Sequence, residues 1–98
     1  MSYSQIVTEN IRLIILRALE EDADYSHNET VIQGVLEAFG YNLSRDKLRT
    51  ELYWLQEQDL AVINDTSGVL VIKLTQRGQD VALGRTRVPG VARRAPGG

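Results

Sequence analysis

The chain has 98 residues, of which 43% are hydrophobic and 24% charged, and its formal net charge is −2. This composition is typical of one soluble globular domain, and the slight acidity argues against strong non-specific binding to nucleic acids. The absence of cysteine excludes disulfides, thiol catalysis and cysteine metal sites, and it fits a reducing cytoplasm. Because no apolar run approaches the roughly 20 residues that span a bilayer, and the first residues lack the features of a signal peptide, we expect no membrane association.

Charge is distributed unevenly along the chain. Residues 1–44 carry seven acidic and two basic residues, whereas residues 45–98 carry nine basic and six acidic ones. An acidic half and a basic half would suit a protein that binds a polyanion with one face. Chance segregation of so few charges is an equal alternative.

The first predicted helix covers residues 5–21, where apolar residues recur at helical spacing: Val7, Ile11, Ile14, Ile15, Ala18 and Leu19. Leu13 and Leu16 lie off this stripe, so the helix is apolar on more than one face. It either packs against a second subunit in a homodimer or is buried between two other helices. The acidic run 20–24 ends it, and we interpret these carboxylates as solubilising rather than metal-binding.

The second predicted helix begins at a capping box formed by Ser26 and Glu29 and runs to about Phe39. Its apolar face carries Val31, Ile32, Val35, Leu36 and Phe39. Gly34 in its interior costs about 1 kcal/mol relative to alanine, which a close crossing with a neighbouring helix would explain. Gly40 suits the left-handed position after a helix end.

The third predicted helix covers residues 44–58, and the rest of the chain is organised around it. Leu48, Leu52 and Leu55 form one buried stripe, and Ser44 is a good N-cap. The other sides of the helix are expected to be free to meet a partner, and they carry Arg45, Arg49, Thr50 and Tyr53.

Two β-branched runs, 59–64 and 69–74, flank a polar turn and predict a β-hairpin with a type I turn and Gly68 in the left-handed position. Thr75 is expected to cap a short fourth helix that Gly84 stops. Residues 85–98 contain four arginines, two prolines and no acid, so we expect an extended or disordered basic tail outside the core. The predicted organisation is therefore one domain, 1–84, followed by a flexible tail, 85–98.

The predicted fold is mainly α with a small β-hairpin, in the order α-α-α-β-β-α. This order resembles the winged helix-turn-helix fold of bacterial regulators of the MarR, ArsR and PadR kinds. The matching residues are Leu48-x3-Leu52-x2-Leu55-x4-Leu60-Ala-Val62 and Leu74-Thr-x2-Gly78-x2-Val81-Ala82. The chain departs from those families at Asp59, where they usually carry a turn glycine.

The whole chain also resembles small winged-helix proteins of Mu-like transposable phages and their prophages. Those proteins share the run Leu48-Arg-Thr-x-Leu-x-Trp-Leu-x-Glu-Gln58 and the ending Arg87-Val-Pro-Gly-Val-Ala-Arg93. Metal sensing of the ArsR type is not expected, because the chain has no cysteine and His27 is its single histidine.

The resemblance implies that the third helix enters the major groove of double-stranded DNA. The candidate DNA-binding residues are Ser44, Arg45, Asp46, Lys47, Arg49, Thr50, Tyr53, Lys73 and Arg77. Arg49 would pair with a guanine, and Asp46 would accept from a cytosine or favour the helix N-terminus. Lys47, Lys73 and Arg77 would contact phosphates, and the tail arginines would reach a groove. The alternative is that these basic residues form a solvated helix face.

Two functions follow from this interpretation. The first is a DNA-binding transcriptional regulator, and the second is a winged-helix adaptor that binds a phage or host protein in phage assembly or DNA packaging. Trp54 is expected to pack against the wing or a dimer partner. No phosphate-binding loop, nucleophile motif or metal-ligand spacing occurs, so we expect neither a cofactor nor enzyme activity.

Overall fold

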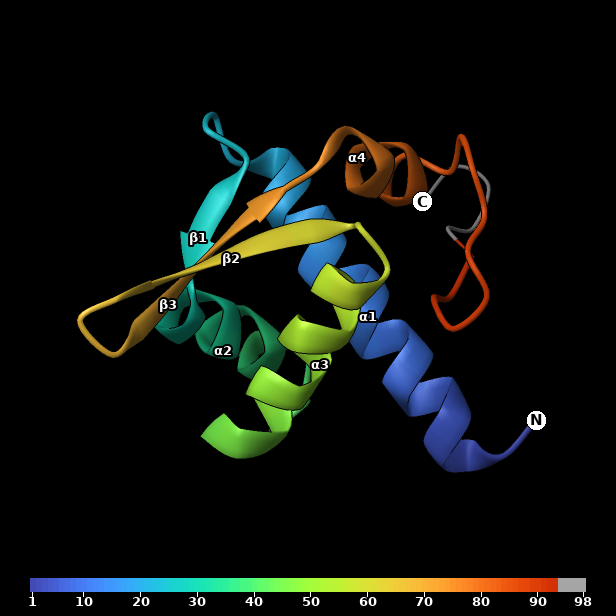
Figure 1. Cartoon of the computed structure of the whole chain (residues 1–98). Coiled ribbons are helices and arrows are strands. Elements are labelled where there is room, and N and C mark those ends of the chain that lie inside the picture. The colour runs from blue at the N-terminus through green and yellow to red at the C-terminus, as the bar shows by residue number, and fades with distance from the viewer. Residues whose placement is uncertain (94–98) are drawn as a thin grey trace.

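A computed structural model of the protein describes residues 1–93, and residues 94–98 lie outside the described part. Along the chain the elements are α1 (Tyr3–Glu21), β1 (Ser26–Asn28), α2 (Glu29–Ala38), α3 (Arg45–Glu57), β2 (Ala61–Thr66), β3 (Val69–Leu74) and α4 (Gln76–Ala82) (Figure 1). The protein is mostly helical, with one small antiparallel sheet in which β3 lies between β1 and β2. Within residues 1–93, no helix combines the length and apolarity needed to cross a bilayer.

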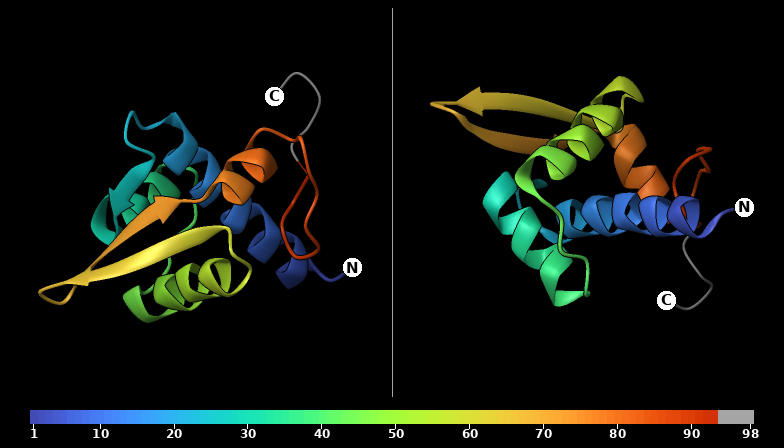
Figure 2. Two further views of the ribbon diagram at one scale, coloured as in Figure 1. Left: turned by 45° about the horizontal axis from the view of Figure 1, so that its top comes forward. Right: turned by 90° about the horizontal axis from the view of Figure 1, so that it is seen from below.

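α1 is the longest helix and contacts α2, β3 and α4. The hairpin of β2 and β3 extends away from the helices at one end of the molecule, whereas the start of α1 and the segment after α4 lie at the other end (Figure 2). The core between them contains the predicted stripe of α3, because Leu48, Leu52 and Leu55 are fully buried. That prediction from the sequence is confirmed.

β1 is a strand that the sequence did not reveal. Residues 26–28 pair antiparallel with residues 71–73 of β3, so the sheet has three strands rather than the two predicted. The N-cap of α2 is consequently Asn28, whose side chain accepts from the backbone N–H of Val31 at 2.8 Å. The predicted capping box of Ser26 and Glu29 is wrong, because Ser26 belongs to the strand and Glu29 is turned into the core.

α2 buries a narrower face than the sequence predicts. Ile32 and Leu36 are buried, but Val31 is 42% exposed and Phe39, predicted to be buried, is 64% exposed. Nothing lies within 4 Å of the position that a Cβ would take at Gly34. The predicted close helix crossing is therefore wrong, and the structure gives no reason for a glycine there.

The hairpin turn contains two residues rather than four. Thr66 pairs with Val69, and the φ angles of Ser67 and Gly68 are 54° and 86°. Positive values at both central residues define a type I′ turn, which matches the twist of the strands better than the predicted type I turn does. The predicted left-handed conformation of Gly68 is confirmed.

The residues around the hairpin's base form the motif by which the sequence resembles winged-helix regulators. Asp59 has a φ of 60°, so it adopts the left-handed conformation at the position where those families carry glycine. Thr75 caps α4 as predicted, accepting from the N–H of Gly78 at 3.0 Å. A Cβ at Gly78 would collide with the carbonyl oxygen of Leu60, which shows that only glycine permits this close approach of α4.

The segment 85–93 packs against the helices. Val88 and Val91 are 4% and 6% exposed, and the backbone N–H of Ala92 donates to the carbonyl oxygen of Glu9 at 3.1 Å. The prediction that the chain after Gly84 contributes nothing to the core is therefore wrong for residues 85–93. The part of the predicted tail at 94–98 lies outside the described residues.

Candidate nucleic-acid interface

α3 positions most of the predicted DNA-binding residues. Ser44 caps the helix by accepting from the backbone N–H of Lys47 at 3.1 Å. Because three leucines fix the inward side of the helix, its outward side exposes Asp46, Lys47, Thr50, Tyr53 and Glu57. Thr50 donates its hydroxyl to the carbonyl oxygen of Asp46 at 3.1 Å. The exposed side of α3 is therefore mixed in charge rather than basic.

Glu29 is the residue on which the predicted basic surface depends, and the sequence did not single it out for this role. Its carboxylate is fully buried and accepts two parallel hydrogen bonds from the guanidinium of Arg49, each 2.8 Å long. It also accepts the backbone N–H of Leu70 at 2.7 Å, and Arg45 lies 3.5 Å away. The hydrogen bonds from Arg49 and Leu70 and the charge of Arg45 together hold the pKa of Glu29 at about 2, against the desolvation that would raise it.

This cluster changes the interpretation of Arg49 and Arg45. Arg49 also donates to the carbonyl oxygen of Gly68 at 3.0 Å, so its guanidinium joins α2, α3 and the hairpin turn. Arg45 donates to the side-chain oxygen of Gln33 at 2.9 Å. Both arginines are therefore paired within the protein rather than unpaired on its surface, although the side chains of Arg49 and Arg45 remain 37% and 41% exposed.

Glu51 forms a second buried carboxylate cluster on the other side of α3. It accepts from Arg12 of α1 at 2.7 Å and from Lys47 at 2.9 Å. Arg12 also donates to the carbonyl oxygen of Gly90 at 2.9 Å and stacks 3.7 Å above the ring of Trp54. Trp54 therefore packs against α1 and the segment 85–93, and the prediction that it packs against the wing is wrong.

The two remaining candidates lie apart from the first turn of α3. Lys73 belongs to the face of the sheet turned away from the core, because it alternates with the buried Ile72 and Leu74. Arg77 donates to the carbonyl oxygen of Gln58 at 3.1 Å, at the C-terminal end of α3. At 1.5 Å per residue, that end lies roughly 18 Å from the first turn. The structure thus brings together the seven predicted residues from 44 to 53 and separates the other two.

The positions of Glu29 and Glu51 in the sequence indicate that both side chains point toward the core. Glu29 precedes the buried Ile32 and Leu36 by three and seven residues, so it lies on the inward face of α2. Glu51 stands three residues after Leu48 and four before Leu55, close to the inward face of α3. A carboxylate on an apolar stripe needs a cation or other donors beside it, so this position marks both glutamates as buried without naming their partners.

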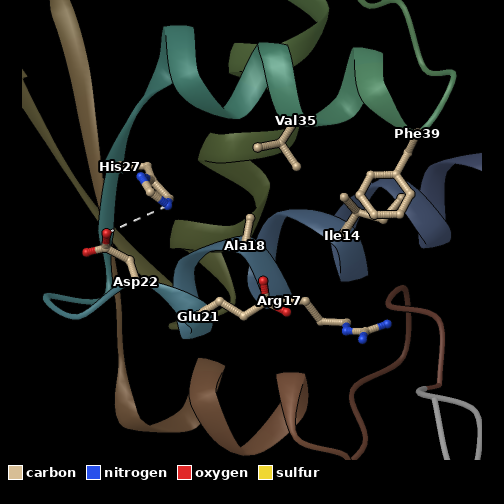
Figure 3. A pocket seen from close by; sticks show the side chains of 8 residues that line it. All are labelled: Ile14, Arg17, Ala18, Glu21, Asp22, His27, Val35 and Phe39. Carbon is tan, nitrogen blue, oxygen red and sulfur yellow. Dashed lines mark ion pairs between the residues drawn. The ribbon is translucent and has the colours of Figure 1, made fainter.

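A groove between α1 and α2 is the second notable surface feature (Figure 3). It has a volume of about 360 Å³ and is lined by Ile14, Arg17, Ala18, Glu21, Asp22, His27, Val35 and Phe39. His27 lies 4.0 Å from Asp22, and the backbone N–H of Asp24 lowers the pKa of Asp22 by bonding to its carboxylate. Among residues 1–93, no group of three or more histidine or acidic side chains is arranged to hold a metal ion.

Comparison with known proteins gives two relatives. The uncharacterized protein gp26 of Escherichia phage Mu is 47% identical over 93 residues, which cover 95% of this chain and 96% of the relative. An uncharacterized protein of Haemophilus influenzae is 42% identical over 78 residues, 79% of this chain and 76% of that one. No protein-family model matches the chain.

Proposed function

This chain belongs to the family of the phage Mu protein gp26, and from that premise we propose that it is a winged-helix DNA-binding protein of Mu-like phages. The observation that supports the fold is the order α1-β1-α2-α3-β2-β3-α4, with β3 between the other two strands. Winged helices share this order, and they insert the helix before the hairpin into the major groove. The proposed role is regulation of transcription through α3.

The first turn of α3 is the proposed contact surface. Arg45 and Lys47 keep 41% and 50% of their side chains exposed, and both lie beside the helix N-terminus, where backbone N–H groups attract phosphate. Each already has a carboxylate partner in the protein, which fixes its position before DNA arrives. In this proposal Arg45 and Lys47 bind phosphates, while Thr50 and Tyr53 face the base edges.

In this proposal Arg49 does not contact a guanine, which is the role that its sequence position predicts. Two of its nitrogens bind Glu29, and one of these also binds the carbonyl oxygen of the hairpin turn. We therefore assign it to positioning: it fixes the hairpin relative to α3, so that helix and wing meet DNA as one rigid surface. A guanine contact by Arg49 would require breaking a bidentate pair with a buried carboxylate.

The test is a fluorescence-anisotropy titration of the protein against labelled duplexes that tile the DNA upstream of its own gene. We expect binding at low salt with a shallow salt dependence, since the logarithmic slope is about −0.9 per phosphate contacted and few cations are exposed. The double variant Arg45→Ala/Lys47→Ala should weaken binding by about tenfold.

The matched control is Arg85→Ala/Arg87→Ala, which removes the same charge from the segment after α4 and should leave affinity within about twofold. Arg49 is kept unchanged in this experiment, because its removal would take two hydrogen bonds from the buried carboxylate of Glu29. Absence of binding at low salt, or an equal loss in both double variants, would contradict the proposal.

The outer face of the sheet favours the second candidate, a protein-binding adaptor in phage assembly or DNA packaging. Val62 and Val69 are 48% and 41% exposed, and Val71 lies between them on the same face as Lys73. Neighbouring exposed valines on one sheet face offer an apolar surface to a protein partner. A phage or host protein that co-purifies from infected cells with the wild type, but not with Val62→Lys, would support this role.

A further inference from the structure

The chain after α4 concentrates positive charge in a protein that is acidic as a whole. All thirteen acidic residues lie within residues 1–80, whereas residues 81–98 contain four arginines and no acid. The formal net charge of the whole chain is −2, so this end differs in sign from the rest. A local excess of cations raises the concentration of anions beside it.

The backbone that carries these arginines has a fixed shape. The carbonyl oxygen of Asp80 accepts from the backbone N–H groups of Arg85 and Thr86, at 2.8 and 3.3 Å. Val88 and Val91, both buried, attach the residues that follow to the core. The arginines are therefore carried by an ordered loop, which lowers the entropy that is lost when an anion binds.

A cavity of about 240 Å³ lies between the end of α4 and this loop. Arg85, Arg87 and Arg93 line it together with small, apolar and hydroxyl-bearing residues. Among residues 1–93, no acidic side chain contributes to the lining. Like charges around one small space repel one another, and an anion placed between them would relieve this repulsion.

Two of the three arginines have no partner in the part of the chain that the structure describes. Arg85 lies 3.5 Å from the carboxylate of Asp80, but Arg87 and Arg93 form neither an ion pair nor a side-chain hydrogen bond within residues 1–93. The backbone N–H groups of Arg87 and Val88 also lack an acceptor there. The three basic residues of α3, by contrast, each have a carboxylate partner.

The negative groups nearest to the cavity are already satisfied. The carbonyl oxygens of Asp80 and Val81, at the end of α4, accept from the N–H groups of Arg85 and Gly84 at 2.8 and 3.1 Å. The carboxylate of Asp80 also accepts from the side chain of Gln76 at 3.3 Å. These bonds reduce the repulsion that a helix C-terminus would otherwise exert on an anion.

We propose that this cavity binds the phosphate group of a small molecule, with Arg87 and Arg93 as its principal donors. A guanidinium donates two parallel hydrogen bonds to an oxyanion. A phosphate carries more oxygens and more charge than a carboxylate, so it can accept from two guanidinium groups and a backbone N–H together.

The location of the cavity separates it from the proposed DNA contact. Figures 1 and 2 show the loop after α4 away from both the hairpin and the first turn of α3. The bound phosphate is therefore not one of those that α3 would contact in a duplex. This site goes beyond the proposed DNA binding and does not depend on it.

The first experiment follows the backbone amide signals of the ¹⁵N-labelled full chain by NMR while sodium phosphate replaces sodium chloride at constant ionic strength. We expect saturable shifts at Arg87 and Val88 with a dissociation constant in the millimolar range or below. Adenosine monophosphate should shift the same signals, and adenosine should not. A lower dissociation constant for the monophosphate would indicate a phosphate monoester as the ligand, and equal constants would indicate inorganic phosphate.

The second experiment repeats the titration with Arg87→Ala/Arg93→Ala, which should raise the dissociation constant by about tenfold. The matched control is Arg17→Ala/Lys73→Ala, because these two side chains also form no ion pair within residues 1–93 and lie outside the cavity. The control should stay within about twofold of the wild type. Since Arg87 and Arg93 bond to nothing in the described protein, their variant should unfold in urea at the wild-type midpoint.

Three results would overturn the site. The wild type could show no saturable shift, chloride could reproduce the shifts, or both double variants could lose equal affinity, and each would mean an adventitious ion only. The sequence predicts instead that these arginines reach a DNA groove. Duplex binding that Arg87→Ala/Arg93→Ala weakens, without any saturable response to phosphate or the monophosphate, would assign the arginines to DNA. Phosphate binding without duplex binding would support this site and contradict the DNA proposal alone.

Discussion

Glu29 and Glu51 are both buried carboxylates beside α3, yet they connect it to opposite parts of the molecule. Glu29 joins α3 to the hairpin through Arg49 and the N–H of Leu70, whereas Glu51 joins it to α1 through Arg12. Glu29 belongs to α2, and one of the hydrogen bonds to its carboxylate comes from a backbone N–H. Glu51 belongs to α3 itself, and one of its partners, Lys47, is 50% exposed.

The comparison shows which groups the basic residues of α3 bind. A run of basic residues on a helix looks like a surface for a polyanion, but here each cation has an internal carboxylate partner. Glu29 accepts a bidentate pair from Arg49 and a backbone N–H as well, whereas Glu51 accepts one bond each from Arg12 and Lys47. The position of the hairpin should therefore depend more strongly on Glu29 than the position of any single element depends on Glu51.

The largest effect that we expect comes from Glu29→Gln. The variant keeps the shape of the side chain but leaves Arg49 without its counter-ion, so it should lower the free energy of unfolding by about 3 kcal/mol. Urea denaturation followed by circular dichroism measures this loss. Glu37→Gln, an exposed change on the same helix, is the control, and equal effects of the two would contradict the assigned role of Glu29.

Measuring the free energy of unfolding as a function of pH tests the same difference between wild type and Glu29→Gln. Folding lowers the pKa of Glu29 from 4.5 to about 2, so its stabilisation is fully present above pH 4.5 and is lost as the pH falls toward 2. The corresponding loss amounts to about 3 kcal/mol. The stability difference between wild type and Glu29→Gln should shrink over this window. A difference that stays constant from neutral pH down to the acid limit would show that Glu29 is not the titrating group.

Gly90→Ala tests the side of the molecule that Glu51 organises. Gly90 has a φ of 96°, and a Cβ there would lie 2.7 Å from the ring of Trp54. The substitution should weaken the docking of residues 85–93 and cost about 2 kcal/mol, through strain and steric conflict together. Trp54 fluorescence during urea unfolding reports both the weaker docking and the loss of stability. An unchanged midpoint and spectrum would mean that this segment adds little to stability.

Gly34→Ala should have the smallest effect and the opposite sign. The position is helical, away from both carboxylate clusters, and has open space around it. Alanine there should raise the free energy of unfolding by about 1 kcal/mol by lowering the entropy of the unfolded chain and favouring the helix. A destabilised variant in thermal unfolding would reveal a need for glycine that the structure does not explain.

The local elements were predictable because each rests on residues close together in the sequence. The leucine stripe of α3, the caps at Ser44 and Thr75 and the left-handed Gly68 were all anticipated correctly. β1 was missed because three residues are too few to show a period, and the strand exists only where β3 offers a free edge.

The sequence by itself determined the helices, the hairpin and the inward direction of the leucines, since periodicity and capping act within a few residues. Only the tertiary structure decided which group each buried carboxylate pairs with. Arg12 and Glu51 are 39 residues apart, and Glu29 and Leu70 are 41 apart, so no local pattern pairs them. The same long-range packing placed Val88 and Val91 in the core, because burial depends on which surface a segment meets as well as on its composition.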